Sequence, residues 1–230
     1  MKISAIIPVA GTGTRFKGKI PKQYSKIHGQ AVIAITVQKF IALDNITDGI
    51  LVAAENEIEN ITRILNKLPG FSDKFKIIPG GKERQDSVYK GLQNVPPDSD
   101  IVVVHDGVRP LVSPKNILDS IKTARTSGAC VVAVPVKDTI KKISSDGAIE
   151  TLSREELWQV QTPQTFRFPI LKKAHEAALK AGYYTTDESA LVEWIGYPVR
   201  IIEGEYTNIK ITTEDDLKLA RILYQKQGKS

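Results

Sequence analysis

The sequence predicts an α/β fold, a mostly parallel, doubly wound (Rossmann-like) sheet with helices on both faces. Short runs rich in β-branched apolar residues alternate with longer amphipathic stretches along the 230 residues. This alternation indicates parallel strands joined by crossover helices. The composition, 41% hydrophobic and 25% charged, is ordinary for a globular chain. We therefore expect one domain over residues 1–230.

The elements follow a regular order in the first part of the chain. The expected strands are Ile3–Val9, Gly49–Ala54, Phe75–Ile78, Ile101–Val104 and Ala129–Pro135. The expected helices are Gln30–Leu43, Glu55–Leu68, Arg84–Gln93 and Pro114–Ser127. Because ligands bind beyond the carboxyl ends of the strands in such sheets, the loops after the strands are candidate functional segments.

A hairpin arm is expected over residues 136–154. Val136–Ile143 alternates like a strand, a turn follows, and Ala148–Leu152 can return as a second strand. Its apolar side chains need cover, because an isolated two-stranded hairpin is at best marginally stable in water. We expect a projecting arm used for dimerisation with a second copy, since isologous homodimers are the commonest oligomers. The alternative is a hairpin that folds back on its own sheet.

The last third of the chain resumes the mixed pattern. The expected elements are a strand over Trp158–Phe166, helices over Pro169–Ala181 and Asp187–Trp194, strands over Pro198–Glu203 and Asn208–Thr212, and a helix over Thr213–Gln227. Thr213 is the expected N-cap of the last helix, because acidic residues fill the turn that follows it.

Charge and composition exclude several classes of protein. The net charge of +6 suits an anionic ligand or a nucleic-acid surface. Aromatic residues are only 7% and no long basic block occurs, so we expect no nucleic-acid partner. No apolar run approaches the ~20 residues of a membrane span, and we expect no signal peptide. With a single cysteine, Cys130, in an expected buried strand, we predict a cytoplasmic protein without a membrane partner.

A glycine-rich turn follows the first expected strand, over Ala10–Arg15. Gly11 and Gly13 allow a tight turn whose N–H groups point at an anion. The arginine of this turn and Lys22 add two positive charges, so the segment predicts a polyphosphate site. The pattern lacks the P-loop spacing, and Phe16 stands where a dinucleotide-binding turn has its third glycine. The alternative is an ordinary strand–helix turn with solvated charges.

The fourth expected strand leads into His105-Asp-Gly-Val-Arg-Pro110. Mg²⁺ prefers one or two carboxylates together with substrate oxygens, which makes Asp106 a candidate metal ligand. Arg109 is a candidate phosphate clamp, because its planar fork matches phosphate oxygens. The alternative is a local salt bridge between these two residues. We expect a structural role for His105, since imidazole is a poor ligand for Mg²⁺.

Three further segments carry weaker signals. Gly80 and Gly81 follow a strand and permit close approach to a flat base, with Ser87 as a hydrogen-bonding group. Thr186-Asp-Glu188 is equally typical of a plain helix N-cap, and Lys210 of a solvated lysine.

Together, these segments resemble the 2-C-methyl-D-erythritol 4-phosphate cytidylyltransferases in order and over nearly the whole chain. The segments that carry the resemblance are Ala10–Arg15 with Pro21–Tyr24, Gly80–Val88, His105–Pro110, Val136–Lys141, Thr162–Gln164, Thr186–Glu188 and Asn208–Thr212. Ribitol-5-phosphate cytidylyltransferases share several of them and are the alternative. Phe16-Lys17 and Gly107-Val108 depart from the usual family pattern, beside the key residues.

The resemblance implies transfer of CMP from CTP to a polyol phosphate, with Mg²⁺ or another divalent cation as cofactor. The implied nucleotide-binding residues are Ala10, Gly11, Thr12, Gly13, Thr14, Gly81, Arg84 and Ser87. The implied catalytic residues are Arg15, Lys22 and Lys210, and the implied metal ligand is Asp106. The implied substrate-binding residues are Asp106, Arg109, Thr139, Arg154, Thr162, Thr186 and Lys210. In this family the arm crosses to a second subunit, which would bring Arg154 into the partner's site.

Two other classes of function make different demands on the sequence. A nucleotide- or nucleic-acid-binding module without chemistry would gather its basic residues on one exposed face, whereas here they stand at strand ends with Asp106. A hydride-transfer enzyme would need the third glycine and an acidic residue ~20 positions further on. The residue types present suit a reaction that depends on positioning and charge neutralisation.

Overall fold

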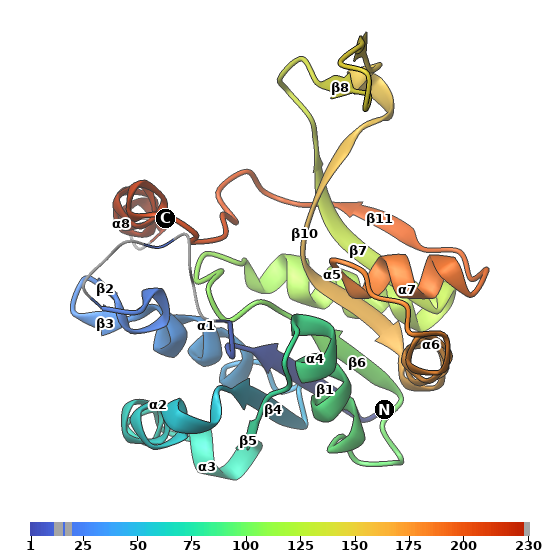
Figure 1. Cartoon of the computed structure of the whole chain (residues 1–230). Helices are drawn as coiled ribbons and strands as arrows, with labels where there is room; N and C mark the ends of the chain where they lie inside the picture. The colour runs from blue at the N-terminus through green and yellow to red at the C-terminus, as the bar shows by residue number, and fades with distance from the viewer. Residues whose placement is uncertain (12–15, 17–19, 228–230) are drawn as a thin grey trace.

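A seven-stranded sheet forms the centre of the computed structural model, which describes residues 1–11, 16 and 20–227 (Figure 1). The strand order is β11-β7-β10-β6-β1-β4-β5. These strands are β1 (Ile3–Pro8), β4 (Asp48–Ala53), β5 (Phe75–Pro79), β6 (Ile101–Val104), β7 (Ala129–Pro135), β10 (Trp158–Arg167) and β11 (Arg200–Glu203). All neighbours pair in parallel except β10, which is antiparallel to both β6 and β7. The predicted mostly parallel sheet is confirmed.

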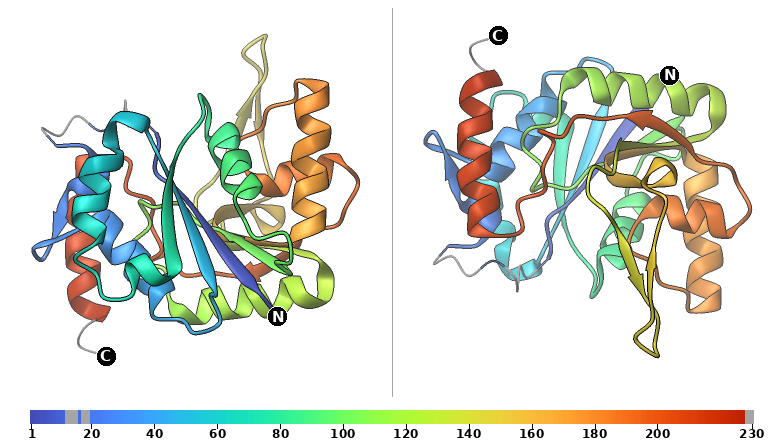
Figure 2. Two further views of the ribbon diagram at one scale, coloured as in Figure 1. Left: turned by 90° about the horizontal axis from the view of Figure 1, so that it is seen from below. Right: turned by 90° about the horizontal axis from the view of Figure 1, so that it is seen from above.

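Helices cover both faces of this sheet (Figure 2). They are α1 (Val32–Ile41), α2 (Ile58–Leu65), α3 (Phe71–Lys74), α4 (Arg84–Gln93), α5 (Pro114–Ser127), α6 (Phe168–Ala181), α7 (Glu188–Trp194) and α8 (Glu214–Gln227). One core contains apolar residues of α1, α2 and α5, and the other contains residues of α4, α6 and α7. Along β1, Ile3, Ala5 and Ile7 enter the first core while Ile6 enters the second, as the period of two in a strand requires.

The C-terminal helix α8 covers the outer side of α1. Val32 and Ile35 of α1 pack with Leu217 and Ala220 of α8 in a third apolar cluster, which explains why the first turns of α1 are apolar all round. The predicted N-cap is confirmed, because the Asp216 N–H donates to the Thr213 hydroxyl (3.2 Å).

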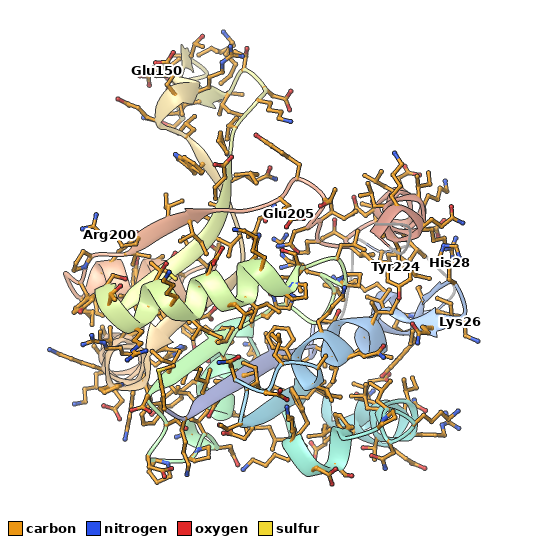
Figure 3. The ribbon with its side chains drawn as sticks, turned by 180° about the vertical axis from the view of Figure 1, so that it is seen from behind. Lys26, His28, Glu150, Arg200, Glu205 and Tyr224 are labelled. Carbon is orange, nitrogen blue, oxygen red and sulfur yellow. The ribbon has the colours of Figure 1, made fainter. Side chains whose placement is uncertain are left out.

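The short β2–β3 hairpin contacts the C-terminal half of α8. Its strands are Lys26–Ile27 and Gln30–Ala31. The His28 ring in its turn stacks on Tyr224 at 5.9 Å between centroids (Figure 3). Arg221 Nε adds a hydrogen bond to the Lys26 carbonyl (3.1 Å).

The arm projects from the body of the molecule (Figure 1). Its tip is a hairpin of β8 (Lys141–Ile143) and β9 (Ile149–Thr151), so the strands are shorter than predicted. Ile143 and Ile149 are 70% and 67% exposed, so the chain gives these side chains no cover of its own. The alternative of a hairpin folded back on its own sheet is wrong, whereas a role in dimerisation stays a prediction.

Two other predicted boundaries are corrected. The helix predicted to begin at Gln30 begins at Val32, because Gln30–Ala31 pairs with β2. Asn208–Thr212 is not a strand: its backbone is irregular, although the Ile211 N–H donates to the Val108 carbonyl (3.0 Å). Its apolar alternation has another cause, since Ile209 and Ile211 pack in the α8 cluster. Within the described ranges, no helix has the length and apolar character needed to cross a bilayer.

The buried His175 on α6 makes the free energy of unfolding depend on pH. The side chain is 2% exposed, stacks on Tyr89 at 5.7 Å between centroids, and burial lowers its pKa from 6.5 to about 4. Between these values the unfolded chain binds a proton that the folded chain does not, so stability rises with pH across this window.

We expect the substitution His175→Phe to remove about 2 kcal/mol of the stability difference between pH 5 and pH 7, because phenylalanine keeps the stacking and cannot titrate. Urea unfolding at both pH values measures the difference. His105 titrates in the same window, so the variant should keep part of the slope. An unchanged slope would mean that His175 is protonated in the folded chain.

Candidate functional site

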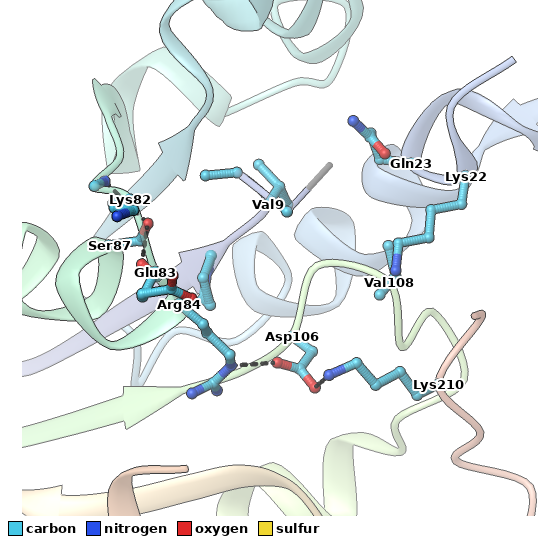
Figure 4. A pocket seen from close by; sticks show the side chains of 14 residues that line it. Val9, Lys22, Gln23, Lys82, Glu83, Arg84, Ser87, Asp106, Val108 and Lys210 are labelled. Atoms are coloured by element: carbon cyan, nitrogen blue, oxygen red, sulfur yellow. Dashed lines mark hydrogen bonds and ion pairs between the residues drawn. The ribbon is translucent and has the colours of Figure 1, made fainter. Parts of the chain in front are cut away.

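A cavity of about 130 Å³ lies at the carboxyl ends of the central strands (Figure 4). The predicted residues that line it are Ala10, Gly11, Lys22, Gly81, Arg84, Ser87, Asp106 and Lys210. They come from the loops after β1, β5 and β6, from the start of α4, from the 3₁₀ helix Lys22–Tyr24, and from the segment before α8. Segments far apart in the sequence thus meet at the carboxyl edge of the sheet, where the loops after the strands were predicted to form a site.

Asp106 lies at the centre of this cavity's charge cluster. Its Oδ1 accepts from Arg84 Nε (3.2 Å), while its Oδ2 lies 3.0 Å from Lys210 Nζ and 3.4 Å from Arg109 Nε. Burial by itself would raise the pKa of Asp106, but Arg84, Lys210 and Arg109 outweigh it and hold the pKa well below its usual value. The carboxylate is therefore ionised at neutral pH.

Arg84 is held from its other side by Glu188, the first residue of α7. Its Nη1 donates to both carboxylate oxygens, at 2.7 and 2.8 Å, and the Glu188 side chain is 1% exposed. Sequence reasoning treated Glu188 only as part of a helix start. The missed signal was its spacing, because Glu188 shares one helix face with the buried residues Leu191 and Val192.

The turn between β5 and α4 requires its glycines. A Cβ on Gly80 would lie 2.7 Å from the Cβ of Ala10, and a Cβ on Gly81 would lie 2.3 Å from that of Asp86. The Ser87 hydroxyl donates to the Glu83 carbonyl (3.1 Å) and accepts from the Gly81 N–H (3.1 Å). The turn is thus fixed, with its backbone packed closely against the loop after β1.

A buried hydrogen-bonded chain supports the backbone of Asp106. The Asp106 N–H donates to Thr162 Oγ1 (3.1 Å), and that hydroxyl lies 2.9 Å from His105 Nδ1. Burial lowers the pKa of His105 to about 4, so the ring is neutral; Nδ1 then accepts from Thr162, and Nε2–H donates to the Arg109 carbonyl (3.1 Å). The structural role predicted for His105 agrees with these contacts.

Other predicted residues do not line the cavity. Thr162 is 3% exposed and lies behind Asp106, while Arg109 donates to the Asn208 carbonyl (2.8 Å). Thr186 is exposed, just before α7. Thr139 and Arg154 lie exposed on the arm and at its base, where Arg154 Nη1 donates to the Lys137 carbonyl (3.2 Å). The predictions for Thr12, Gly13, Thr14 and Arg15 concern positions outside the described residues.

The cavity's charge favours an anionic ligand. Four cations line it, Lys22, Lys82, Arg84 and Lys210, against two carboxylates, which gives a net charge of +2 (4 − 2). Figure 4 shows Lys22, Arg84 and Lys210 extending from three separate parts of the chain.

The residues of the cavity could bind a metal ion only together with oxygen atoms of a bound substrate. Over the described ranges, no group of three His, Cys, Asp or Glu side chains could hold an ion. Asp106 is ionised and lines the cavity, so it fits a hard divalent cation as a single carboxylate ligand, with the remaining ligands supplied by phosphate oxygens and water.

Comparison with known proteins places the chain in one family. The model of the family "2-C-methyl-D-erythritol 4-phosphate cytidylyltransferase" matches residues 3–226. Curated proteins of that name from Desulforamulus reducens and Pelotomaculum thermopropionicum are 42% and 44% identical over 227 and 232 residues. These matches cover 98% and 99% of this chain and 97% of each relative.

Solved structures agree with this placement. A 4-diphosphocytidyl-2C-methyl-D-erythritol synthase from Anaerococcus prevotii superposes with a TM-score of 0.87 at 33% identity, over 97% of this chain and 98% of that one. The Thermus thermophilus 2-C-methyl-D-erythritol 4-phosphate cytidylyltransferase gives 0.80 at 30% identity, over 98% and 100%. The chain therefore belongs to the 2-C-methyl-D-erythritol 4-phosphate cytidylyltransferase family of nucleotidyltransferases.

Proposed function

We propose that this cytidylyltransferase uses the cavity at the carboxyl edge of the sheet to transfer CMP from CTP to 2-C-methyl-D-erythritol 4-phosphate. The observation that carries the proposal is the convergence of Lys22, Arg84 and Lys210 on the edge that holds Asp106. The family model and the relatives favour methylerythritol phosphate over the ribitol phosphate alternative. A cytoplasmic location stays a prediction from the sequence.

The nucleotide occupies the side of the cavity formed by the loops after β1 and β5. The Ala10–Arg15 loop and Lys22 hold the triphosphate, and Gly81, Arg84 and Ser87 lie along the cytosine and ribose. Support comes from the close packing of Gly80 against Ala10, which brings the two turns together, and from the position of Gly81, Arg84 and Ser87 in the lining of the cavity.

In the reaction, a phosphate oxygen of the polyol phosphate attacks the α-phosphorus of CTP. A new P–O bond forms as the bond to the β-phosphate oxygen breaks, and pyrophosphate leaves. The attacking oxygen is already anionic, so no general base is needed. Arg15, Lys22 and Lys210 neutralise the charge that develops on the transferred and leaving phosphates.

Mg²⁺, or another divalent cation, is the proposed cofactor. Asp106 would hold it, and the cation would supply further neutralisation of the triphosphate. The pairing of Asp106 with Lys210 supports this role, because the lysine side chain is 35% exposed and has room to turn toward a phosphate instead.

The acceptor phosphate lies on the other side of Asp106. Arg109 and Thr186 are the proposed contacts from the same chain, while Thr162 supports the Asp106 backbone from behind. The partner subunit's Thr139 and the partner subunit's Arg154 complete the pocket. The exposed arm supports the proposal of a homodimer, because its apolar side chains need the cover that a second copy would give.

Pyrophosphate release tests the proposed function directly. The chain is incubated with each of CTP, UTP, ATP and GTP, together with methylerythritol phosphate or ribitol 5-phosphate. We expect release with CTP and methylerythritol phosphate. Faster release with ribitol 5-phosphate would select the alternative substrate, and CTP binding without release for any pair would indicate a non-catalytic nucleotide-binding module.

Asp106→Asn should raise the Mg²⁺ concentration for half-maximal activity about tenfold and lower the maximal rate, because the amide keeps the shape without the charge that holds a hard cation. A Mg²⁺ titration at saturating substrates measures this. The matched control is Asp98→Asn, since Asp98 is exposed and pairs with Lys2. An unchanged midpoint for Asp106→Asn would limit Asp106 to its salt bridges.

A further inference from the structure

Gln85, in the first turn of α4, connects this helix to the segment between α6 and α7. Its Nε2 donates to the Tyr183 carbonyl (2.9 Å), and its Oε1 accepts from the Thr185 N–H (3.0 Å). Gln85 is 9% exposed and is not among the residues that line the cavity. A buried amide that bonds two backbone groups of one irregular segment fixes that segment in place.

Apart from Gln85, few side chains connect the segment 183–187 to the body, and one of them, Gln164, donates from Nε2 to Asp187 Oδ2 (2.9 Å) and holds the end of the segment next to α7. It has no regular secondary structure, and Thr186 in its middle is exposed. The Tyr183 ring stacks on Trp194 at 4.6 Å between centroids, on the outer side of the molecule. The remaining side-chain contact with α4, from the Tyr184 hydroxyl to Asp86 (3.1 Å), is exposed to solvent and therefore weak. The two part-buried hydrogen bonds of Gln85 are therefore the stronger contacts between α4 and residues 183–185.

The first turn of α4, in contrast, is fixed without Gln85. Glu83 and Asp86 form a capping box at the helix start. Ser87 bonds to the turn before it, and Arg84 is paired with both Asp106 and Glu188. Loss of the Gln85 amide should therefore loosen the segment 183–187 and leave the α4 turn in place.

We propose that Gln85 is a positioning residue for the acceptor substrate: it holds the segment 183–187, with Thr186, at a fixed place relative to the nucleotide-binding turn. The inference rests on the proposed function, which assigns Thr186 to the acceptor phosphate and the α4 turn to CTP. Gln85 thus connects the turn assigned to CTP with the segment assigned to the acceptor. The glutamine itself contacts neither substrate.

The substitution Gln85→Met tests this role, because methionine matches the length of glutamine and removes both hydrogen bonds. We expect the KM for methylerythritol phosphate to rise about tenfold, while the KM for CTP changes less than about twofold. Thermal shifts add a second readout: CTP should stabilise the variant as it stabilises the wild type, and the additional shift from the acceptor should be lost. Gln93→Met is the matched control, the same change at an exposed position of α4.

The outcomes separate this inference from the proposed function. An equal rise of both KM values would indicate general loosening of α4 and overturn the role of Gln85, as would no change in either. If Gln85→Met does not fold, Gln85→Glu takes its place, because the carboxylate loses the donor to Tyr183 and keeps the acceptor for Thr185. Failure of the wild type to release pyrophosphate overturns the proposed function itself.

Discussion

Lys22→Ala is expected to lower kcat roughly 10²–10³-fold, because removal of one preorganised group that stabilises developing transition-state charge has a cost of that size. The lysine lines the cavity from a short 3₁₀ helix, and this helix keeps its place in the variant because the Tyr24 hydroxyl still bonds to Glu57. The thermal midpoint should therefore stay within about 2 °C of the wild type. Steady-state pyrophosphate release and a thermal melt measure both quantities.

The control for this prediction is Lys26→Ala, which removes an exposed lysine on the neighbouring β2 strand. We expect this variant to keep nearly full activity. Arg15→Ala should behave as Lys22→Ala does, since both side chains are assigned to the phosphates. Near-normal turnover of Lys22→Ala would show that the polyphosphate is bound elsewhere.

Arg154→Ala should be equally inactive, and its activity should return in mixed dimers. If the arm crosses between subunits, the arginine of one chain completes the cavity of the other. In a dimer of one Arg154→Ala chain and one Lys22→Ala chain, one site then has both residues intact. Random exchange would restore about a quarter of the wild-type activity, because half of the dimers are mixed and half of their sites are intact.

Mixing Lys22→Ala with Lys210→Ala is the matched control. Both lysines line the cavity of their own chain, so no site in that mixed dimer is intact and no activity should return. Native mass spectrometry confirms that the subunits exchange. If exchange occurs and Arg154→Ala still gains nothing, then Arg154 acts in its own chain or not at all.

Sequence reasoning located the site because the sheet imposes simple geometry. Parallel strands bring their carboxyl ends to one edge, so Gly81 and Asp106 meet there although 25 positions separate them (106 − 81). Local patterns also gave the bounds of β6, α4 and α5, where apolar periodicity and helix-start signals coincide.

The rest of the site depends on tertiary packing that no local pattern contains. Glu188 is buried against Arg84 across 104 positions, and its ion pair exists only because the fold brings the starts of α4 and α7 together. Gln164 fixes the start of α7 by accepting from the N–H groups of Glu188 and Ser189, at 3.0 and 3.1 Å. Such contacts follow from the fold, so a sequence pattern can suggest only that these polar residues face inward.

The pairing of strand β10 implies that insertions are tolerated at the tip of the arm but not beside the cavity. The strand pairs with β7 near the arm through Trp158–Val160, and again in the body through Gln164–Phe166, with an irregular step between. A residue inserted in this step would turn the alternating side chains onto the wrong faces and displace Thr162 from Asp106. Extension of both hairpin strands at the turn 144–147 would instead lengthen the arm by about 3.3 Å per residue pair, without altering the strand beneath it. Arm length is therefore free to diverge between lineages at the tip, while the spacing from Trp158 to Gln164 is constrained.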